Sequence, residues 1–555
     1  MKKLLSILMV LAMILAMSTN AFAAENTSVT ITNSDGKTYK GYKILNLTTS
    51  LKTGEHHPNT CDGNHSDDCF NYAYTIANDN YRKILQIETF DKAGASLWGS
   101  NKPATANDVT DAQILEHLSK QSGDNGDAYG TMRSVADRIY RAIKAWNADP
   151  ANATNQITAD LTIANGNSNS VEQGYWIFAD VTDLDGTTDN ANSLVLVDTK
   201  GQDALTINPK SAIPTIEKKV KDIEDSEDSS IEDNPWHDTA DHDIGDTVPF
   251  KLTATLPSNA HLYDSYELIF HDKLSEGLTL DETSIKVWMY ETKHKADVDL
   301  DVNDGTALVL GTDYEINTAG LADDCSFEIV LGNVKNIAGV TSTSSFVVCY
   351  EAELNDHAKI GIAGNPNEVY LEFSNNPYGE GSGKTAPDKV TVFTYQLVVN
   401  KTDSHGHELK GAGFTLYKKD VSGTYAAIGA ELKGADMTQF IWNGLDDGDY
   451  KLSETTIPEG YNKMSDIVFS ISAEHSENTG KFELVSLDGG LMGMGEKVDG
   501  KFTGKIIKEI VNHTGTVLPE TGAQGTFLLI CGGSLLVILA AVFMITRKKM
   551  SIYEN

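Results

Sequence analysis

The chain has few basic residues for its acidic ones: 44 lysines and arginines stand against 79 aspartates and glutamates in 555 residues, a formal net charge of −35. No basic stripe is available to meet phosphates, so nucleic acid is excluded as a partner. The sequence also lacks a glycine-rich nucleotide-binding loop, and no serine or cysteine nucleophile lies in a defensible catalytic motif. We therefore expect no cofactor and no enzyme acting on other molecules, and the acidic surface suits a soluble exterior protein.

The N-terminus has the pattern of an export signal. Two lysines precede an apolar run from Leu4 to Met17, and Ala21-Phe22-Ala23 forms an A-x-A cleavage site. The sequence therefore predicts a signal peptide over residues 1–23, cleaved before Ala24, because the apolar run is too short for an uncleaved anchor.

The C-terminus holds an ordered set of three features. Leu518-Pro519-Glu520-Thr521-Gly522 precedes an apolar run from Gly525 to Thr546, which Arg547-Lys548-Lys549 follows. About twenty apolar residues can cross a membrane once as a helix, and the basic cluster stays on the cytoplasmic side. This order resembles a Gram-positive cell-wall sorting signal, in which a sortase cuts between Thr and Gly and passes the Thr carbonyl to an amine. The alternative is an ordinary single-pass protein with a chance pentapeptide.

The rest of the chain divides into three segments, in keeping with its length and a hydrophobic content of 40%. Residues 24–211 combine strands with a helix expected over Met132–Trp146, which predicts an α+β domain. Residues 212–394 alternate like an antiparallel β-sandwich, and residues 395–514 like a smaller β domain. Residues 515–555 are the sorting signal with its transmembrane helix. The predicted fold class is mainly β, with tandem Ig-like sandwiches.

The third segment is expected to bury a lysine. Leu397, Val399 and Lys401 share one strand face, and the same parity turns Glu454 and Asn512 inward. Three buried polar groups are costly unless they pair. An amide bond between lysine and asparagine, with loss of ammonia, resolves this. Burial lowers the pKa of the lysine and raises that of the glutamate, so a neutral amine attacks while the carboxyl polarises the carbonyl.

Parts of this segment resemble the Cna-B-like domains of Gram-positive surface proteins, and the middle part resembles the pilin E-box. They are Val399–Asp403, Tyr450–Thr455, Pro458–Tyr461 and Ile510–Asn512. The resemblance implies that Lys401 and Asn512 form an intramolecular isopeptide bond and that Glu454 catalyses it. The alternative is three surface polar residues on ordinary strands.

The second segment repeats this logic. Parity turns Lys218, Asp272 and Asn375 inward and leaves Lys219 and Asn376 on the other face. The stretches around Asp272 and Asn375 resemble the isopeptide-forming middle domain of pilus shaft subunits. This resemblance implies a Lys218–Asn375 bond with Asp272 as the catalytic acid. Surface residues are again the alternative.

Upstream of Lys218, Thr206–Lys210 resembles the pilin motif, although Asn208 stands where tyrosine is usual. The resemblance makes Lys210 the amine that receives the Thr521 carbonyl of the next subunit, so it should be exposed. A solvated lysine between domains is the alternative.

Two cysteine pairs are candidate disulfides among the five cysteines of the chain. Cys325 and Cys349 fall on strands expected to be neighbours in an exported domain. Cys61 and Cys69 lie in a polar insert, where a local disulfide is favoured. With two nearby histidines they could instead bind zinc, and we assign no metal site.

As a whole the sequence resembles the major shaft subunit of a sortase-assembled pilus. The resemblance implies a wall-anchored surface protein, held briefly by its membrane helix. Its implied partners are a class C-type pilin sortase, a housekeeping sortase, identical subunits added head to tail, peptidoglycan, minor tip and base pilins, and host surface ligands. Two other classes remain open: a non-polymerising wall-anchored adhesin, and an anchored exported hydrolase with convergent carboxylates in its first domain.

Overall fold

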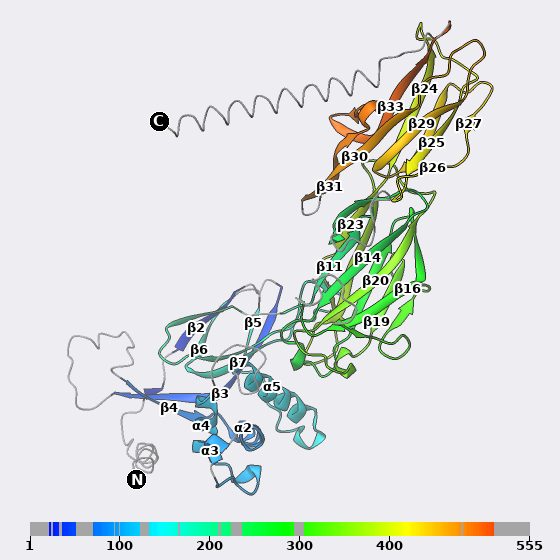
Figure 1. Ribbon diagram of the computed structural model, residues 1–555. Coiled ribbons are helices and arrows are strands. Elements are labelled where there is room, and N and C mark those ends of the chain that lie inside the picture. The colour runs from blue at the N-terminus through cyan, green and yellow to red at the C-terminus, as the bar shows by residue number, and fades with distance from the viewer. Residues whose placement is uncertain are drawn as a thin grey trace, which may run out of the picture.

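The chain folds into three units that follow one another in space (Figure 1). The computed structural model describes residues 22–23, 26–32, 36–51, 70–93, 95–98, 100–121, 132–164, 167–208, 212–223, 236–293, 305–478 and 481–515. Within these ranges the structure is mainly β, as predicted, and the α-helices that are described over their whole length lie in the first unit. A helix long and apolar enough to span a bilayer is not found in them. The expected transmembrane segment lies outside the described residues.

The first unit packs helices on one face of a six-stranded sheet and a three-stranded sheet on the other. Strand β7 shows why: Ile177 joins the core beneath the helices, whereas Trp176 and Phe178 join the core beneath the small sheet. The elements are β1 (Phe22–Ala23), β2 (Asn26–Ile31), β3 (Thr38–Leu51), β4 (Phe70–Ile76), α2 (Asp79–Lys92), α3 (Ala95–Trp98), α4 (Asp111–Ser119), α5 (Met132–Ala148), β5 (Leu161–Ala164), β6 (Ser168–Glu172), β7 (Gly174–Asp180), β8 (Thr187–Thr188), β9 (Leu194–Asp198) and β10 (Ala204–Ile207).

The expected helix is confirmed as α5, which buries Val135, Ile139 and Ile143 at helical spacing. Three further helices of this unit, α2, α3 and α4, escaped the sequence analysis. Asn78 caps the start of helix α2, because its side chain accepts a hydrogen bond from the Tyr81 amide, and a capping box precedes α4.

The second unit is a β-sandwich. One sheet has the order β12-β11-β14-β20-β16-β17 and the other β13-β23-β21-β15-β19-β18. Two of its strands form parallel pairs, β13 with β23 and β22 with β8 of the first unit, so the purely antiparallel expectation needs this correction. The strands are β11 (Thr215–Lys221), β12 (Trp236–His237), β13 (Thr239–Asp241), β14 (Thr247–Thr255), β15 (Leu268–Leu274), β16 (Leu278–Tyr290), β17 (Thr306–Ala307), β18 (Glu315–Asn317), β19 (Phe327–Leu331), β20 (Ser345–Leu354), β21 (Asn365–Ser374), β22 (Ser382–Lys384) and β23 (Asp388–Phe393).

The third unit packs the sheet β28-β24-β33-β32 against the sheet β26-β25-β29-β30-β31. Its first and last strands, β24 and β33, lie side by side and run parallel. The strands are β24 (Tyr395–Asp403), β25 (Gly413–Lys419), β26 (Tyr425–Ala427), β27 (Leu432–Lys433), β28 (Gln439–Leu445), β29 (Gly448–Thr456), β30 (Ile467–Asn478), β31 (Lys481–Asp488), β32 (Gly495–Val498) and β33 (Lys501–Asn512).

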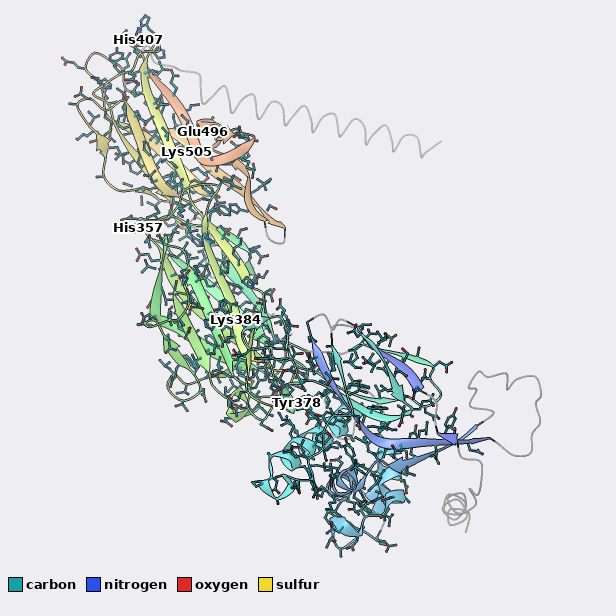
Figure 2. All side chains as sticks on the ribbon, turned by 180° about the vertical axis from the view of Figure 1, so that it is seen from behind. His357, Tyr378, Lys384, His407, Glu496 and Lys505 are labelled. Atoms are coloured by element: carbon teal, nitrogen blue, oxygen red, sulfur yellow. The ribbon has the colours of Figure 1, made fainter. Side chains whose placement is uncertain are left out.

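Polar contacts and one strand pair join successive units. Strand β8 of the first unit pairs with β22 of the second, and Lys144 of α5 donates to the carbonyl of Tyr378, which Figure 2 labels at this junction. Lys418 of the third unit forms a 2.7 Å ion pair with Asp243 of the second. The backbones approach closely there too, because a Cβ at Gly504 would stand 2.1 Å from Gly361 Cα.

Candidate crosslinking sites

The third unit brings Lys401, Glu454 and Asn512 together at one end of its core. Each side chain is at most 1% exposed. Lys401 pairs with Ile510 across β24 and β33, so Asn512, two residues further on, shares its face. Asn512 Nδ2 donates to Glu454 Oε1 at 2.7 Å, and Glu454 Oε2 accepts from the Met464 amide at 2.8 Å. The three residues chosen from the sequence therefore do meet.

The chemistry of this cluster favours attack by the lysine. Lys401 Nζ donates to the backbone carbonyls of Thr402 and Ile510 at 2.9 and 3.0 Å, and no carboxylate of the described residues lies within ion-pair distance of it. Burial lowers the pKa of Lys401 to about 8, although the nearby Glu454 opposes the shift. Asn512 Oδ1 is buried and has no hydrogen-bond partner among the described residues. A partly neutral amine thus lies beside an amide whose carbonyl oxygen is free to accept a proton.

The second unit buries Lys218 and Asp272 completely. Lys218 Nζ lies 2.5 Å from Asp272 Oδ2 and donates to the Tyr350 hydroxyl at 2.9 Å. Burial lowers the pKa of Lys218 to about 8 and raises the pKa of Asp272, while each group's charge partly opposes the shift of the other. Both shifts favour the neutral amine and the neutral acid that the sequence analysis requires.

The amide beside this pair is Asn367, not Asn375. Asn367 is fully buried on β21, and its Nδ2 donates to the same Tyr350 hydroxyl at 2.7 Å. Like that of Asn512, its Oδ1 is buried and accepts no hydrogen bond from the part of the chain that the structure describes. Amine, acid and amide thus converge on Tyr350, a residue that the sequence analysis missed although strand parity turns it inward with Phe346 and Val348.

The prediction of Asn375 is wrong because of strand register. The Lys218 amide donates to Asp388, which pairs with Val369 of β21, so Lys218 is level with Val369. Asn375 stands six residues further along, about 20 Å at ~3.3 Å per residue. Its Nδ2 instead donates to the carbonyls of Leu184 and Ser382 at 2.8 Å each, at the junction with the first unit.

The predicted Cys325–Cys349 disulfide is also wrong, since both thiols are free. Cys349 lies on β20, with its neighbour Val347 in a small cluster apart from the main core, whereas Cys325 precedes β19 of the opposite sheet. The two strands follow one another in the sequence but belong to different layers, so the thiols cannot meet.

Several predicted residues lie outside the described part of the chain. They are Cys61, Cys69, Lys210 and the sorting motif Leu518 to Gly522. Near Lys210, the structure describes Asn208, which is exposed just after β10 and whose Oδ1 accepts a hydrogen bond from Thr32. The chain therefore leaves the first unit at its surface.

Two family models match segments of this chain. Residues 395–484 match the SpaA domain, described as a prealbumin-like fold domain, and residues 510–551 match the LPXTG cell wall anchor motif. The chain is a wall-anchored protein with a SpaA domain. These matches confirm the resemblances seen in the third segment and in the sorting signal, and they place the protein at the cell wall.

A curated relative extends this likeness. The trypsin-resistant surface T6 protein of Streptococcus pyogenes serotype M6 (strain ATCC BAA-946 / MGAS10394) is 29% identical over 267 residues. The match covers 45% of this chain and 44% of the relative, so the chain matches less than half of that protein's length.

Solved pilin structures resemble the chain at low identity. The T6 backbone pilin of serotype M6 Streptococcus pyogenes has 18% identity and a TM-score of 0.46, covering 90% of this chain and 100% of that one. The major pilin SpaD from Corynebacterium diphtheriae has 16% identity and a TM-score of 0.38, covering 66% and 87%. The major pilin subunit BcpA of Bacillus cereus has 18% identity and a TM-score of 0.35, covering 65% and 91%.

Proposed function

We propose that this protein is the shaft subunit of a pilus that sortase assembles, and that isopeptide bonds within its second and third units strengthen the fibre. The observation that carries the proposal is the burial of Lys401, Glu454 and Asn512 together in a unit that adjoins a wall anchor. Three buried polar groups would destabilise that core as separate side chains. A bond that consumes the amine and the amide removes this cost.

Bond formation in the third unit needs no outside reagent. The neutral Nζ of Lys401 attacks Cγ of Asn512, while protonated Glu454 donates its proton to Oδ1 after a half-turn of the carboxamide exchanges Oδ1 and Nδ2. The tetrahedral intermediate collapses, the amide nitrogen leaves as ammonia with one proton from Nζ, and Glu454 recovers its own. One C–N bond forms and one breaks, and no electrons are transferred.

In the second unit we propose the same reaction between Lys218 and Asn367. Tyr350 accepts hydrogen bonds from both the amine and the amide, and it donates to Asp272, 3.1 Å away. The hydroxyl therefore holds the two reactants side by side. After the same half-turn of the Asn367 carboxamide, it can pass a proton to Oδ1 and take one from Asp272. In the second unit the lysine, Lys218, is paired with the acid. In the third unit the acid, Glu454, is instead hydrogen-bonded to the asparagine, Asn512.

For assembly, the donor is the Thr521 carbonyl and the acceptor is Lys210 of the next subunit. The T6 relative is described as a surface protein, and Asn208 of this chain is exposed; both support this pairing. One donor and one acceptor at separate places allow head-to-tail addition without closure. The partners are then a pilin-type sortase, a housekeeping sortase that attaches the base to peptidoglycan, and identical subunits.

The test is a wall extract boiled in detergent and probed for this protein. Wild-type cells should show a high-mass ladder, Lys210→Ala should leave wall-bound monomer, and Thr521→Ala should lose both ladder and wall attachment. Lys40→Ala, at an exposed strand position of the first unit, is the matched control and should keep the ladder. A ladder that survives Lys210→Ala would show that another lysine is the acceptor.

Asn208 stands where the pilin motif usually has tyrosine, and this difference favours a second candidate function, a wall-anchored adhesin that does not polymerise. In that case wild-type cells would show monomer alone, while both internal bonds still form.

A further inference from the structure

A cluster of four metal-ligating side chains lies on the outer face of a sheet in the second unit. His271 on β15 points away from the sandwich core, opposite in parity to Asp272, and pairs directly with Glu328 of β19. The turn before β19 adds Asp323 and Cys325. Imidazole, thiol and two carboxylates thus converge at one point, and neither crosslinking site uses any of them.

The spacing of these atoms fits one small ion. From His271 Nδ1 the distances are 3.0 Å to Asp323 Oδ2, 3.5 Å to Glu328 Oε1 and 3.9 Å to Cys325 Sγ. All four ligand atoms lie within 4.8 Å of one another. Four ligands placed 2.0–2.3 Å from a tetrahedral zinc ion stand roughly 3.3–3.8 Å apart, so small side-chain movements would complete the coordination.

Groups around the cluster hold the ligands in place. The other imidazole nitrogen, Nε2, lies 3.6 Å from Glu372 Oε2, the arrangement in which a carboxylate orients a metal-binding histidine. Asn317 Nδ2 donates to Glu328 Oε2 at 3.2 Å, and the Tyr370 hydroxyl donates to Asp323. The Tyr370 ring also stacks on the imidazole, with centroids 4.5 Å apart. These contacts leave the ligand orientations little freedom.

The charge of the cluster also calls for a cation. Asp323, Glu328 and Glu372 surround a single imidazole that is only 6% exposed. The backbone amide of Cys325 donates to Asp323 Oδ1 at 3.2 Å, which turns the thiol into the same group. A bound divalent ion would offset the carboxylates and would favour the thiolate form of the cysteine.

We propose that His271, Asp323, Cys325 and Glu328 bind one divalent transition-metal ion of the zinc class. Thiolate and imidazole together select such a metal over calcium or magnesium, which prefer oxygen ligands alone. The ion would tie the turn at residues 323–325 to β15, the strand that carries Asp272.

Cobalt substitution tests this site, because a Co2+–thiolate bond gives a charge-transfer band in the near ultraviolet. The sample is residues 24–515, which include all three folded units, with Cys61→Ser and Cys69→Ser so that only two thiols remain. After treatment with a chelator, Co2+ should bind at one equivalent with this band, and Zn2+ should displace it. Zn2+ should also raise the melting temperature, because it binds the folded state.

Single substitutions locate the site. Cys325→Ser should abolish the band, and Glu328→Gln should weaken Co2+ binding about tenfold or more. Cys349→Ser is the matched control, since Cys349 is the other free thiol but lies on the opposite sheet, and it should change neither. The proposal is overturned if no saturable binding occurs, if the band persists in Cys325→Ser, or if Cys349→Ser removes it.

Discussion

Replacing Asn367 tests the register argument in the second unit most directly. If Lys218 bonds to Asn367, the measured mass of the wild-type protein falls short of its sequence mass by one ammonia, about 17 Da, at this site. In Asn367→Ala this part of the deficit should disappear. Asn375→Ala should leave the mass deficit unchanged, because that amide bonds the carbonyls of Leu184 and Ser382 instead. Peptide mapping should show Lys218 and Asn367 in one branched peptide after protease digestion.

The stability change can be worked out from the loop that the bond closes. Lys218 and Asn367 enclose roughly 150 residues, and chain entropy gives about 5 kcal/mol for a crosslink over such a loop. For a domain of this size, 1 kcal/mol shifts the melting temperature by roughly 2–4 °C, so losing the bond should lower it by about 10–20 °C. Asp272→Asn keeps the side-chain shape and removes the acid, and it should reproduce both the mass gain and the loss of stability.

Asn375→Ala separates the crosslink from ordinary packing. It should destabilise the junction with the first unit by about 1–3 kcal/mol, since two buried carbonyls lose their donor, but without a mass change. If Asn375→Ala regains the ammonia mass and Asn367→Ala does not, the register argument is refuted.

Two further predictions concern the third unit. Glu454→Gln should prevent the bond, so its intact mass should keep the ammonia of about 17 Da that the wild-type protein loses. Limited proteolysis should also show that trypsin cuts the third unit. If the mass deficit remains in Glu454→Gln, Glu454 has no part in the mechanism. In Lys218→Ala, where only the third unit can react, the rate of mass loss after refolding should stop rising with pH above about 8. Burial lowers the pKa of Lys401 to about 8, so a higher pH supplies little more neutral amine while it removes the proton that Glu454 must donate. A rate that still rises steeply between pH 8 and pH 10 would contradict this.

Strand parity was sufficient to predict which side chains face inward but not which of them meet. Lys218, Asp272, Lys401, Glu454 and Asn512 are all buried as expected. Asn367 and Asn375 have the same parity, because the side-chain period of a strand is two residues. The choice between them depends on register, which pairing across the sheet sets and one sequence does not reveal.

The other corrections have related physical causes. Cys325 lies just before β19, and Cys349 lies on the next strand, β20. These two strands belong to different layers of the sandwich, as consecutive strands often do. Helix α2 did leave a signal, since Tyr81, Ile84 and Leu85 repeat at helical spacing after the cap at Asn78. For Tyr350 the only signal in the sequence was strand parity, which predicts a buried side chain but not the partners of its hydroxyl.

If both bonds form, they decide which parts of the chain carry load in a fibre. Tension that enters after Asn512 passes across the bond to Lys401 on the adjacent parallel strand, so residues 402–511 are bypassed. In the second unit the load continues along β23 and β21 to Asn367, crosses to Lys218, and bypasses residues 219–366. The loaded stretch between the two bonds is then residues 367–401, which contains β22, β23 and the connection between the second and third units.

Single-molecule pulling tests this route, with attachment points at residues 212 and 515. The wild-type protein should extend without releasing either bypassed loop. Lys401→Ala should add one unfolding step of roughly 350–400 Å, because about 110 freed residues extend by at most 3.3–3.6 Å each. Lys219→Ala is the control, since this neighbour of Lys218 faces away from the reacting groups and pairs with Asp238; it should behave like the wild type. A step of that length in wild-type protein would mean that the third unit carries load through its hydrogen bonds alone.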